Sequence, residues 1–149
     1  MTLTRREALG LTAGAAAFLT LAPRIAFAAT EDTEAAIKAF TGGAMPESGK
    51  ISLDTPEIAE NGNTVPVAVS VESPMTADDY VESVLILADG NPSPAVATFH
   101  FTAMSGAADA KTRIRLAKTQ NVIAVAKMSN GSTFMDKKEV KVTIGGCGG

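Results

Sequence analysis

The chain has 149 residues, 46% of them hydrophobic and 5% aromatic, with 13 Lys and Arg against 16 Asp and Glu and a net charge of −3. An acidic chain of this kind lacks the basic surface that nucleic-acid binding requires, so that class of function is excluded. The length suits one domain with a modest core, and without tryptophan and with a single tyrosine that core must be aliphatic.

Residues 1–28 have the parts of an export signal. Arg5 and Arg6 form a basic start, a run of small and apolar residues extends from Ala8 to Ala22, and Ala26-Phe27-Ala28 offers a cleavage site. The paired arginines resemble a twin-arginine signal, which predicts a periplasmic protein exported by that route. An ordinary secretory signal or a retained anchor is the alternative. The apolar run is too short and too alanine-rich for a good membrane span, so we expect no stable membrane anchoring.

Cleavage near Ala29 would remove three arginines and one glutamate, leaving 10 basic and 15 acidic residues and a net charge of −5. A short helix is predicted to open the mature chain, with Thr30 as its N-cap and acidic residues in its first turn. Ile37 and Phe40 lie three residues apart on one helix face, and Gly42-Gly43 is expected to end the helix.

From Lys50 onward, apolar residues recur with the period of two that is typical of half-buried strands. Val122 to Met128 is apolar on both faces apart from Lys127, which indicates a central strand. The pattern predicts an all-β domain over residues 29–144, an immunoglobulin-like antiparallel β-sandwich of about seven strands without the usual inter-sheet disulfide. The clearest strands are expected at residues 65–71, 81–87, 97–101, 112–116, 122–128 and 134–144.

The chain ends in Gly145-Gly146-Cys147-Gly148-Gly149, which contains its only cysteine. No internal disulfide can form, so an exported protein of this kind has either a free reactive thiol or an intermolecular bond. Glycines keep the backbone mobile and leave space around the cysteine. We therefore predict a flexible arm over residues 145–149, with a reach of roughly 10 Å from Ile144 to the cysteine.

This tail is poorly suited to catalysis, because catalytic groups must be held precisely and glycines allow movement. The thiol has no neighbouring histidine, lysine or arginine in the sequence, so activation would have to come from a receiving enzyme. No catalytic triad or phosphate loop is recognisable. These features favour a non-enzymatic covalent carrier. An interaction module whose cysteine forms an intermolecular disulfide, or one with an idle tail, remains open at this point.

Three other polar residues could contribute to function. His100, the only histidine, lies on the polar face of an alternating strand, where a solvent-facing or interface role is favoured over metal binding. Arg113 and Arg115 share one strand face, with Lys111 in register. They could steer an anion or meet an acidic partner, although a solvated polar face is the simpler interpretation.

Several segments together resemble the SoxY family, the sulfur-carrier subunits of the periplasmic thiosulfate-oxidising Sox system. The specific feature is the terminal Gly-Gly-Cys-Gly-Gly. Supporting features are the twin-arginine-like signal, the helix ending in Phe40-Thr41-Gly42-Gly43 and the stretch from Ile58 to Val67. The resemblance covers essentially the whole chain.

The resemblance implies that Cys147 is the sulfur attachment site, carrying thiosulfonate and persulfide intermediates without any other cofactor. Gly145, Gly146, Gly148 and Gly149 would be the hinge of the arm. It also implies a heterodimer with a SoxZ-like subunit. The transient partners would be the SoxAX cytochrome, which attaches thiosulfate, the SoxB hydrolase, which releases sulfate, and, where present, the SoxCD sulfane dehydrogenase.

Overall fold

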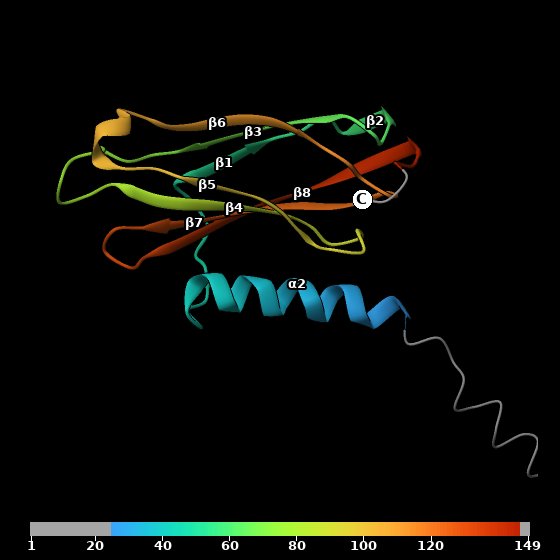
Figure 1. The fold of residues 1–149 in the computed structure, drawn as a ribbon, viewed down its shortest axis with the longest axis horizontal. Helices are drawn as coiled ribbons and strands as arrows, with labels where there is room; N and C mark the ends of the chain where they lie inside the picture. The colour runs from blue at the N-terminus through green and yellow to red at the C-terminus, as the bar shows by residue number, and fades with distance from the viewer. Residues whose placement is uncertain (1–24, 147–149) are drawn as a thin grey trace, which may run out of the picture.

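The structure is a computed structural model that describes residues 25–146. A β-sandwich lies above a helix in the described part of the chain, which ends at the right-hand edge of the sandwich in Figure 1. The all-β sandwich with an N-terminal helix that the sequence predicted is confirmed. Cys147, Gly148 and Gly149, and the predicted signal with Arg5 and Arg6, lie outside the described residues.

The described residues form eight strands: β1 (Ile51–Asp54), β2 (Ile58–Asn61), β3 (Val65–Val71), β4 (Val81–Ala88), β5 (Ala95–His100), β6 (Ala108–Ile114), β7 (Gln120–Met128) and β8 (Thr133–Ile144). They make two sheets, one of three strands in the order β1-β3-β6 and one of five in the order β2-β8-β7-β4-β5. The 3-10 turn η1 (Ala103–Ser105) connects the two sheets between β5 and β6.

The pairing differs from the prediction at one place, because β2 and β8 run parallel, with Ile58 opposite Lys141 and Asn61 opposite Ile144. All other paired strands are antiparallel. Period-two alternation indicates which side chains face the core, but it carries no information about strand direction. The sandwich is therefore mixed rather than purely antiparallel.

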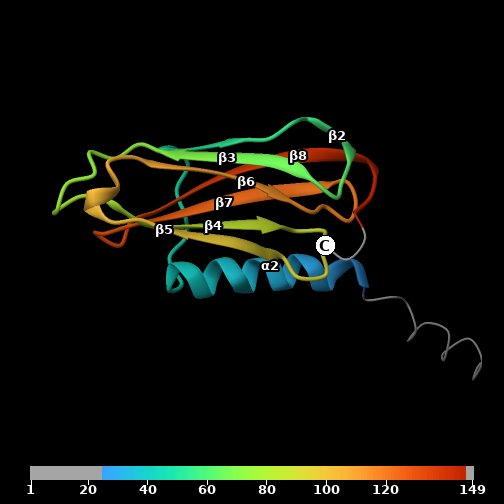
Figure 2. The same cartoon turned by 45° about the horizontal axis from the view of Figure 1, so that its top comes forward.

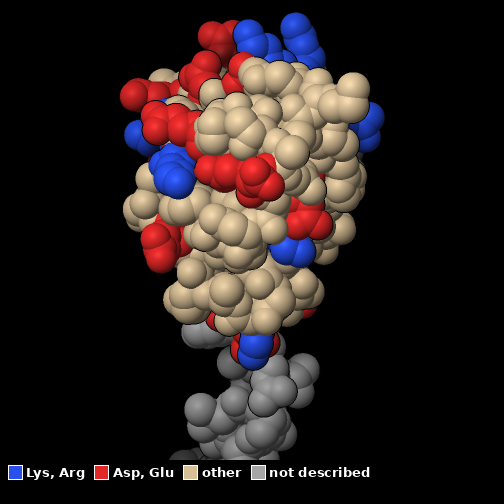
Figure 3. Space-filling view, turned by 90° about the vertical axis from the view of Figure 1, so that its left-hand side faces the viewer, with Lys and Arg blue, Asp and Glu red and all other residues tan. Residues whose placement is uncertain are grey.

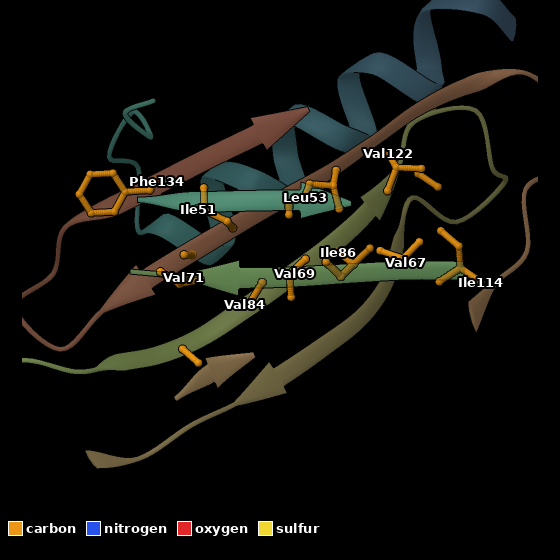
Figure 4. Packing of buried hydrophobic residues seen from close by; sticks show 14 of the residues in the cluster. Ile51, Leu53, Val67, Val69, Val71, Val84, Ile86, Ile114, Val122 and Phe134 are labelled. Carbon is orange, nitrogen blue, oxygen red and sulfur yellow. The ribbon is translucent and has the colours of Figure 1, made fainter. Parts of the chain in front are cut away.

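The core between the sheets is aliphatic, as the composition predicted. Alternate residues of β1 and β3, such as Leu53 and Val69, point toward Val84 and Ile86 of β4 and Val122 of β7 (Figure 4). Leu53, Val84, Ile86 and Val122 have no exposed surface at all. Burial of branched aliphatic side chains is the main favourable contribution to the stability of such a domain.

Helix α2 (Ile25–Thr41) covers the outer face of the five-stranded sheet (Figure 2). Ile37 and Phe40 pack against a second apolar cluster that includes Leu87 and Val125, both fully buried. The sheet thus has apolar contacts on both faces, which explains why β4 and β7 are buried almost continuously. The prediction that residues 122–128 form a central strand is confirmed, because β7 is the third of five strands.

The predicted start of the helix is wrong for the full-length chain. The helix begins at Ile25 rather than after Thr30, and no acidic residue lies in its first turn. The residues before Thr30 continue the helix, so Thr30 does not act as its N-cap. The predicted end is confirmed: Gly42 and Gly43 have φ angles of 70° and 93°, and the Gly43 amide donates to the Lys38 carbonyl. Within the described part, no helix is long and apolar enough to cross a membrane.

Candidate functional site: the root of the C-terminal arm

The last described residues pack against the body of the sandwich. Strand β8 ends at Ile144, as predicted, and Gly145 and Gly146 follow it. Gly146 is buried, and its amide donates a 2.9 Å hydrogen bond to the carbonyl of Leu116. Cys147 is the next residue in the chain, so its attachment point to the domain is defined even though the cysteine itself is not described.

Three backbone segments meet at this point, which we call the arm root: the turn at Gly62, the loop at Leu116, and Ile144 to Gly146. The Gly62 amide donates to the Ile144 carbonyl at 2.7 Å, and the Leu116 amide donates to the Gly62 carbonyl at 2.8 Å. Leu116 therefore donates through its amide to Gly62 and accepts through its carbonyl from Gly146. The arm root is therefore held by backbone hydrogen bonds, which do not depend on side-chain identity.

The close approach of these backbones requires glycine. A Cβ atom on Gly62 would collide with the Leu116 carbonyl oxygen and lie 2.8 Å from the Gly146 nitrogen. A Cβ atom on Gly145 would collide with the carbonyl oxygen of Ala117, and one on Gly146 would lie 2.8 Å from the Gly62 oxygen. These contacts are with backbone atoms, which cannot rotate away as a flexible side chain can.

The expectation of an arm that is free from Gly145 onward therefore needs correction. In the described structure, Gly145 and Gly146 belong to the packed edge of the domain. Their glycine identity serves close packing there, whereas sequence reasoning assigned it to flexibility alone. The part of the predicted hinge formed by Gly148 and Gly149 lies outside the described residues and stays a prediction.

Two buried polar side chains hold the loop that receives Gly146. Asn91 is 3% exposed; its side-chain amide donates to the Arg115 carbonyl at 2.8 Å, and its oxygen accepts from the Ala117 amide at 3.0 Å. Gln120 donates to the same Asn91 oxygen at 2.8 Å and accepts from the Gly90 amide at 2.7 Å. Both side chains are hydrogen-bonded, as buried polar groups must be to avoid a desolvation cost.

Sequence reasoning did not identify Gly62, Leu116, Asn91 or Gln120 as parts of the site. Gly62 follows Asn61 in a dipeptide that is typical of a turn, although an isolated glycine beside a strand can also signal a close backbone approach. Asn91 precedes Pro92, and this pair is also typical of a turn. Nothing in the local pattern indicates that Asn91 and Gln120 meet, because their contact depends on the packing of separate loops.

The other predicted polar residues do not converge on the arm root as a cluster. His100 is exposed on β5, opposite Ser83 and on the polar face, which confirms its solvent-facing position. Lys111, Arg113 and Arg115 are also exposed. Among the described residues, no group of three or more His, Cys, Asp and Glu side chains is placed to hold a metal ion.

Comparison with known proteins gives a clear family match. The family model for "Sulfur oxidation protein SoxY" matches residues 37–147 and so extends to Cys147 itself. The structure is similar to that of the sulfur carrier protein SoxY from Chlorobium limicola f thiosulfatophilum, with 36% sequence identity and a TM-score of 0.62. That match covers 77% of this chain and 99% of the Chlorobium chain. No curated protein sequence gives a significant match.

The fold is also shared with a different class of protein. The superoxide reductase (neelaredoxin) from Ignicoccus hospitalis matches with a TM-score of 0.57 over 64% of this chain and 81% of its own, at 19% identity. The superoxide reductase from Nanoarchaeum equitans matches with a TM-score of 0.54 over 64% and 99%, at 14% identity. At these identities the similarity concerns the sandwich alone.

Proposed function

This chain belongs to the SoxY family of sulfur oxidation proteins, and we propose that it is a non-enzymatic carrier that binds sulfur intermediates covalently through Cys147. The observation that carries the proposal is the position of this single cysteine, one residue beyond a glycine that is hydrogen-bonded to the domain. A thiol at this position follows directly on the packed edge of the domain and has a glycine on each side, Gly146 and Gly148.

The proposed chemistry begins with oxidative coupling. A bond forms between the Cys147 sulfur and the outer sulfur of thiosulfate, while one proton and two electrons leave. The product is a cysteine S-thiosulfonate, and the electrons pass to a cytochrome partner of the SoxAX type. Because the chain offers no basic residue next to Cys147 in sequence, thiol activation is assigned to that partner.

Hydrolysis would follow on a SoxB-type enzyme. Water attacks the terminal sulfur of the thiosulfonate and the bond between the two outer sulfurs breaks. Sulfate leaves, both protons of the water are released, and a persulfide anion remains on Cys147. A SoxCD-type dehydrogenase, where the organism has one, would oxidise that remaining sulfur. Covalent attachment keeps a reactive sulfane sulfur from diffusing away and raises its effective concentration at each enzyme.

The proposal includes a cellular setting. The chain would be exported folded by the twin-arginine route, with Arg5 and Arg6 in its signal, and would work in the periplasm. It would travel as a heterodimer with a SoxZ-like subunit. The alternative is a binding module whose tail is passive or linked to another chain by a disulfide.

Mass spectrometry of the protein from thiosulfate-grown cells tests this function. We expect adducts on Cys147 of about +112 Da for a thiosulfonate and about +32 Da for each added sulfur, since covalent attachment leaves these groups on the thiol. Cys147→Ser changes only the sulfur atom to oxygen and serves as the matched control, which should lose both the adducts and thiosulfate oxidation. Normal thiosulfate oxidation by the serine variant would refute the carrier function. Deleting residues 147–149 leaves the packed Gly145 and Gly146 in place, so loss of function in that variant distinguishes the carrier from a module with a passive tail.

A further inference from the structure

An exposed isoleucine stands where the arm leaves the domain. Ile144, the last residue of β8, is 66% exposed. The other large hydrophobic side chains that are mostly exposed in the described part of the chain are those of Met45, Ile58 and Met104. A single exposed hydrophobic side chain is common on protein surfaces and by itself indicates nothing. Ile144 differs through its position, because Cys147 follows it by three residues.

The backbone of Ile144 is held in place on both sides. Its carbonyl accepts the 2.7 Å hydrogen bond from the Gly62 amide, and Asn61 lies opposite it in the parallel register of β2 and β8. Two residues earlier, the Val142 amide donates to Oγ1 of Thr119 at 2.9 Å. Ile144 is therefore presented by a fixed strand end, so a partner that binds it has little backbone freedom to restrict.

The residues that border the arm root are uncharged. The strand register, the hydrogen bonds and the close backbone contacts place six of them there, namely Asn61, Gly62, Asn63, Leu116, Ala117 and Thr119. Charged residues of both signs adjoin this set in the sequence: Glu60, Arg115 and Lys118, with Lys141 earlier on β8. An apolar side chain inside an uncharged border can be buried against a partner without removing a charge from water, as at the centres of protein interfaces.

The short connection to Cys147 decides what must cover Ile144. With Gly146 hydrogen-bonded to Leu116, the Cα atom of Cys147 lies about 3.8 Å from that of Gly146, and full release of Gly145 and Gly146 extends it only to roughly 10 Å from Ile144. An enzyme that acts on the sulfur must bring its reacting atoms within about 3–3.5 Å of it. A specific interface covers about 800 Å² on each partner, a patch of roughly 16 Å radius. An interface centred on the arm root therefore includes Ile144.

We propose that Ile144 is the apolar anchor on which the enzyme that receives Cys147 docks, through an uncharged and apolar surface around the mouth of its active site. The inference rests on the proposed carrier function and identifies where the partner enzyme touches the body of the carrier. The residues on both sides of Cys147 are glycines, which offer no side chains for recognition. Side-chain recognition must therefore come from the body, and a buried aliphatic anchor at the centre of an interface supplies it.

Met104 provides a matched control. It is 95% exposed on η1, at the opposite end of the sandwich from the arm root (Figure 1). Strand β6, with seven residues, separates η1 from the Leu116 loop by roughly 20 Å, which places Met104 outside an interface centred on the arm root. That end also presents uncharged surface, between side chains of both signs (Figure 3).

The experiment uses full-length carrier loaded with thiosulfonate by reaction of Cys147 with tetrathionate, a disulfide exchange that releases thiosulfate and a proton. Sulfate release by the SoxB-type hydrolase of the same organism then gives kcat and KM at low and high salt. Wild type is compared with Ile144→Ser, Ile144→Met and Met104→Ser. Hydrogen exchange at Gly146 and co-purification with the SoxZ-like subunit are measured for each variant.

We expect Ile144→Ser to raise KM at least about tenfold while kcat stays within about twofold of wild type. The rise should be the same at low and high salt, because salt does not screen an apolar contact. Ile144→Met keeps an apolar side chain and should stay within about threefold of wild type, and Met104→Ser within about twofold. The Gly146 amide should stay protected in Ile144→Ser, since the backbone hydrogen bonds of the arm root do not involve this side chain.

An unchanged KM in Ile144→Ser, or an equal rise in Met104→Ser, would overturn the proposal. Loss of Gly146 protection in Ile144→Ser would overturn it as well, because the side chain would then support the arm root. Loss of co-purification with the SoxZ-like subunit would make Ile144 part of the subunit interface, with the same consequence. If wild-type protein cannot be loaded on Cys147, or is loaded and never processed, the carrier function itself fails, which is distinguishable from a defect confined to Ile144→Ser.

Discussion

Substituting Gly62 by alanine is the sharpest test of the arm root. Gly62 does not have a positive φ, so the alanine backbone itself is not strained. The added Cβ would collide with the Leu116 carbonyl oxygen and would lie 2.8 Å from the Gly146 nitrogen and 2.9 Å from Cγ1 of Val142. Two of these three atoms belong to the hydrogen bond between Gly146 and Leu116, so that bond must give way first.

The size of the effect follows from these contacts. Overpacking costs about 1–3 kcal/mol, and each hydrogen bond that is lost or left unmade adds about 1 kcal/mol. We expect Gly62→Ala to lower the free energy of unfolding by about 2–4 kcal/mol, with a fall in Tm of roughly 8–15 °C. Because Gly146 lies beyond the last residue of β8, part of the strain should be relieved by local release of the segment after Ile144.

Hydrogen exchange measures the local release of Gly146, and thermal unfolding measures the loss of stability of the whole domain. The Gly146 amide should lose its protection in Gly62→Ala, and Cys147 should react faster with a small thiol reagent than in wild type. The control is Gly131→Ala, where the glycine has a φ of 86° and open space around it. That variant should cost about 1 kcal/mol of backbone strain and leave Gly146 protected. Wild-type stability together with wild-type protection of Gly146 in Gly62→Ala would refute the reasoning.

Three further predictions concern other parts of the chain. Asn91→Asp should lower stability by about 2–3 kcal/mol and speed exchange at Gly146, because a carboxylate would face the Arg115 carbonyl without a proton to donate; urea unfolding and hydrogen exchange check this. Phe40→Ala should cost about 2–3 kcal/mol by removing a half-buried ring from the cluster under the helix, measured as a lower urea midpoint, and unchanged stability would contradict the packing of α2. Replacing Arg5 and Arg6 by lysine should leave uncleaved precursor in the cytoplasm, as fractionation and immunoblotting would show, if the twin-arginine route is used.

Much of the fold follows from local patterns in the sequence. Alternation in β3 specifies which residues face the core, and the doubly apolar run in β7 indicates a strand covered on both faces. Gly42 and Gly43 end the helix where predicted, since glycine can adopt a positive φ without the steric cost that a Cβ atom imposes. The predicted helix start was wrong because the sequence pattern assigns residues 25–28 to the end of the signal. In the structure the same residues form the first turn of the helix.

Cysteine count and hydrophobic period can be read locally, so the residue pattern alone indicates one thiol after the last strand of an aliphatic sandwich. The attachment of Gly146 to Leu116, the parallel pairing of β2 with β8 and the close approach of Gly62 to Gly146 follow only from the folded chain. The physical reason is that a meeting of three distant backbones is made of amide and carbonyl groups that every residue carries. Such a meeting leaves no sequence pattern beyond the glycines that make room for it.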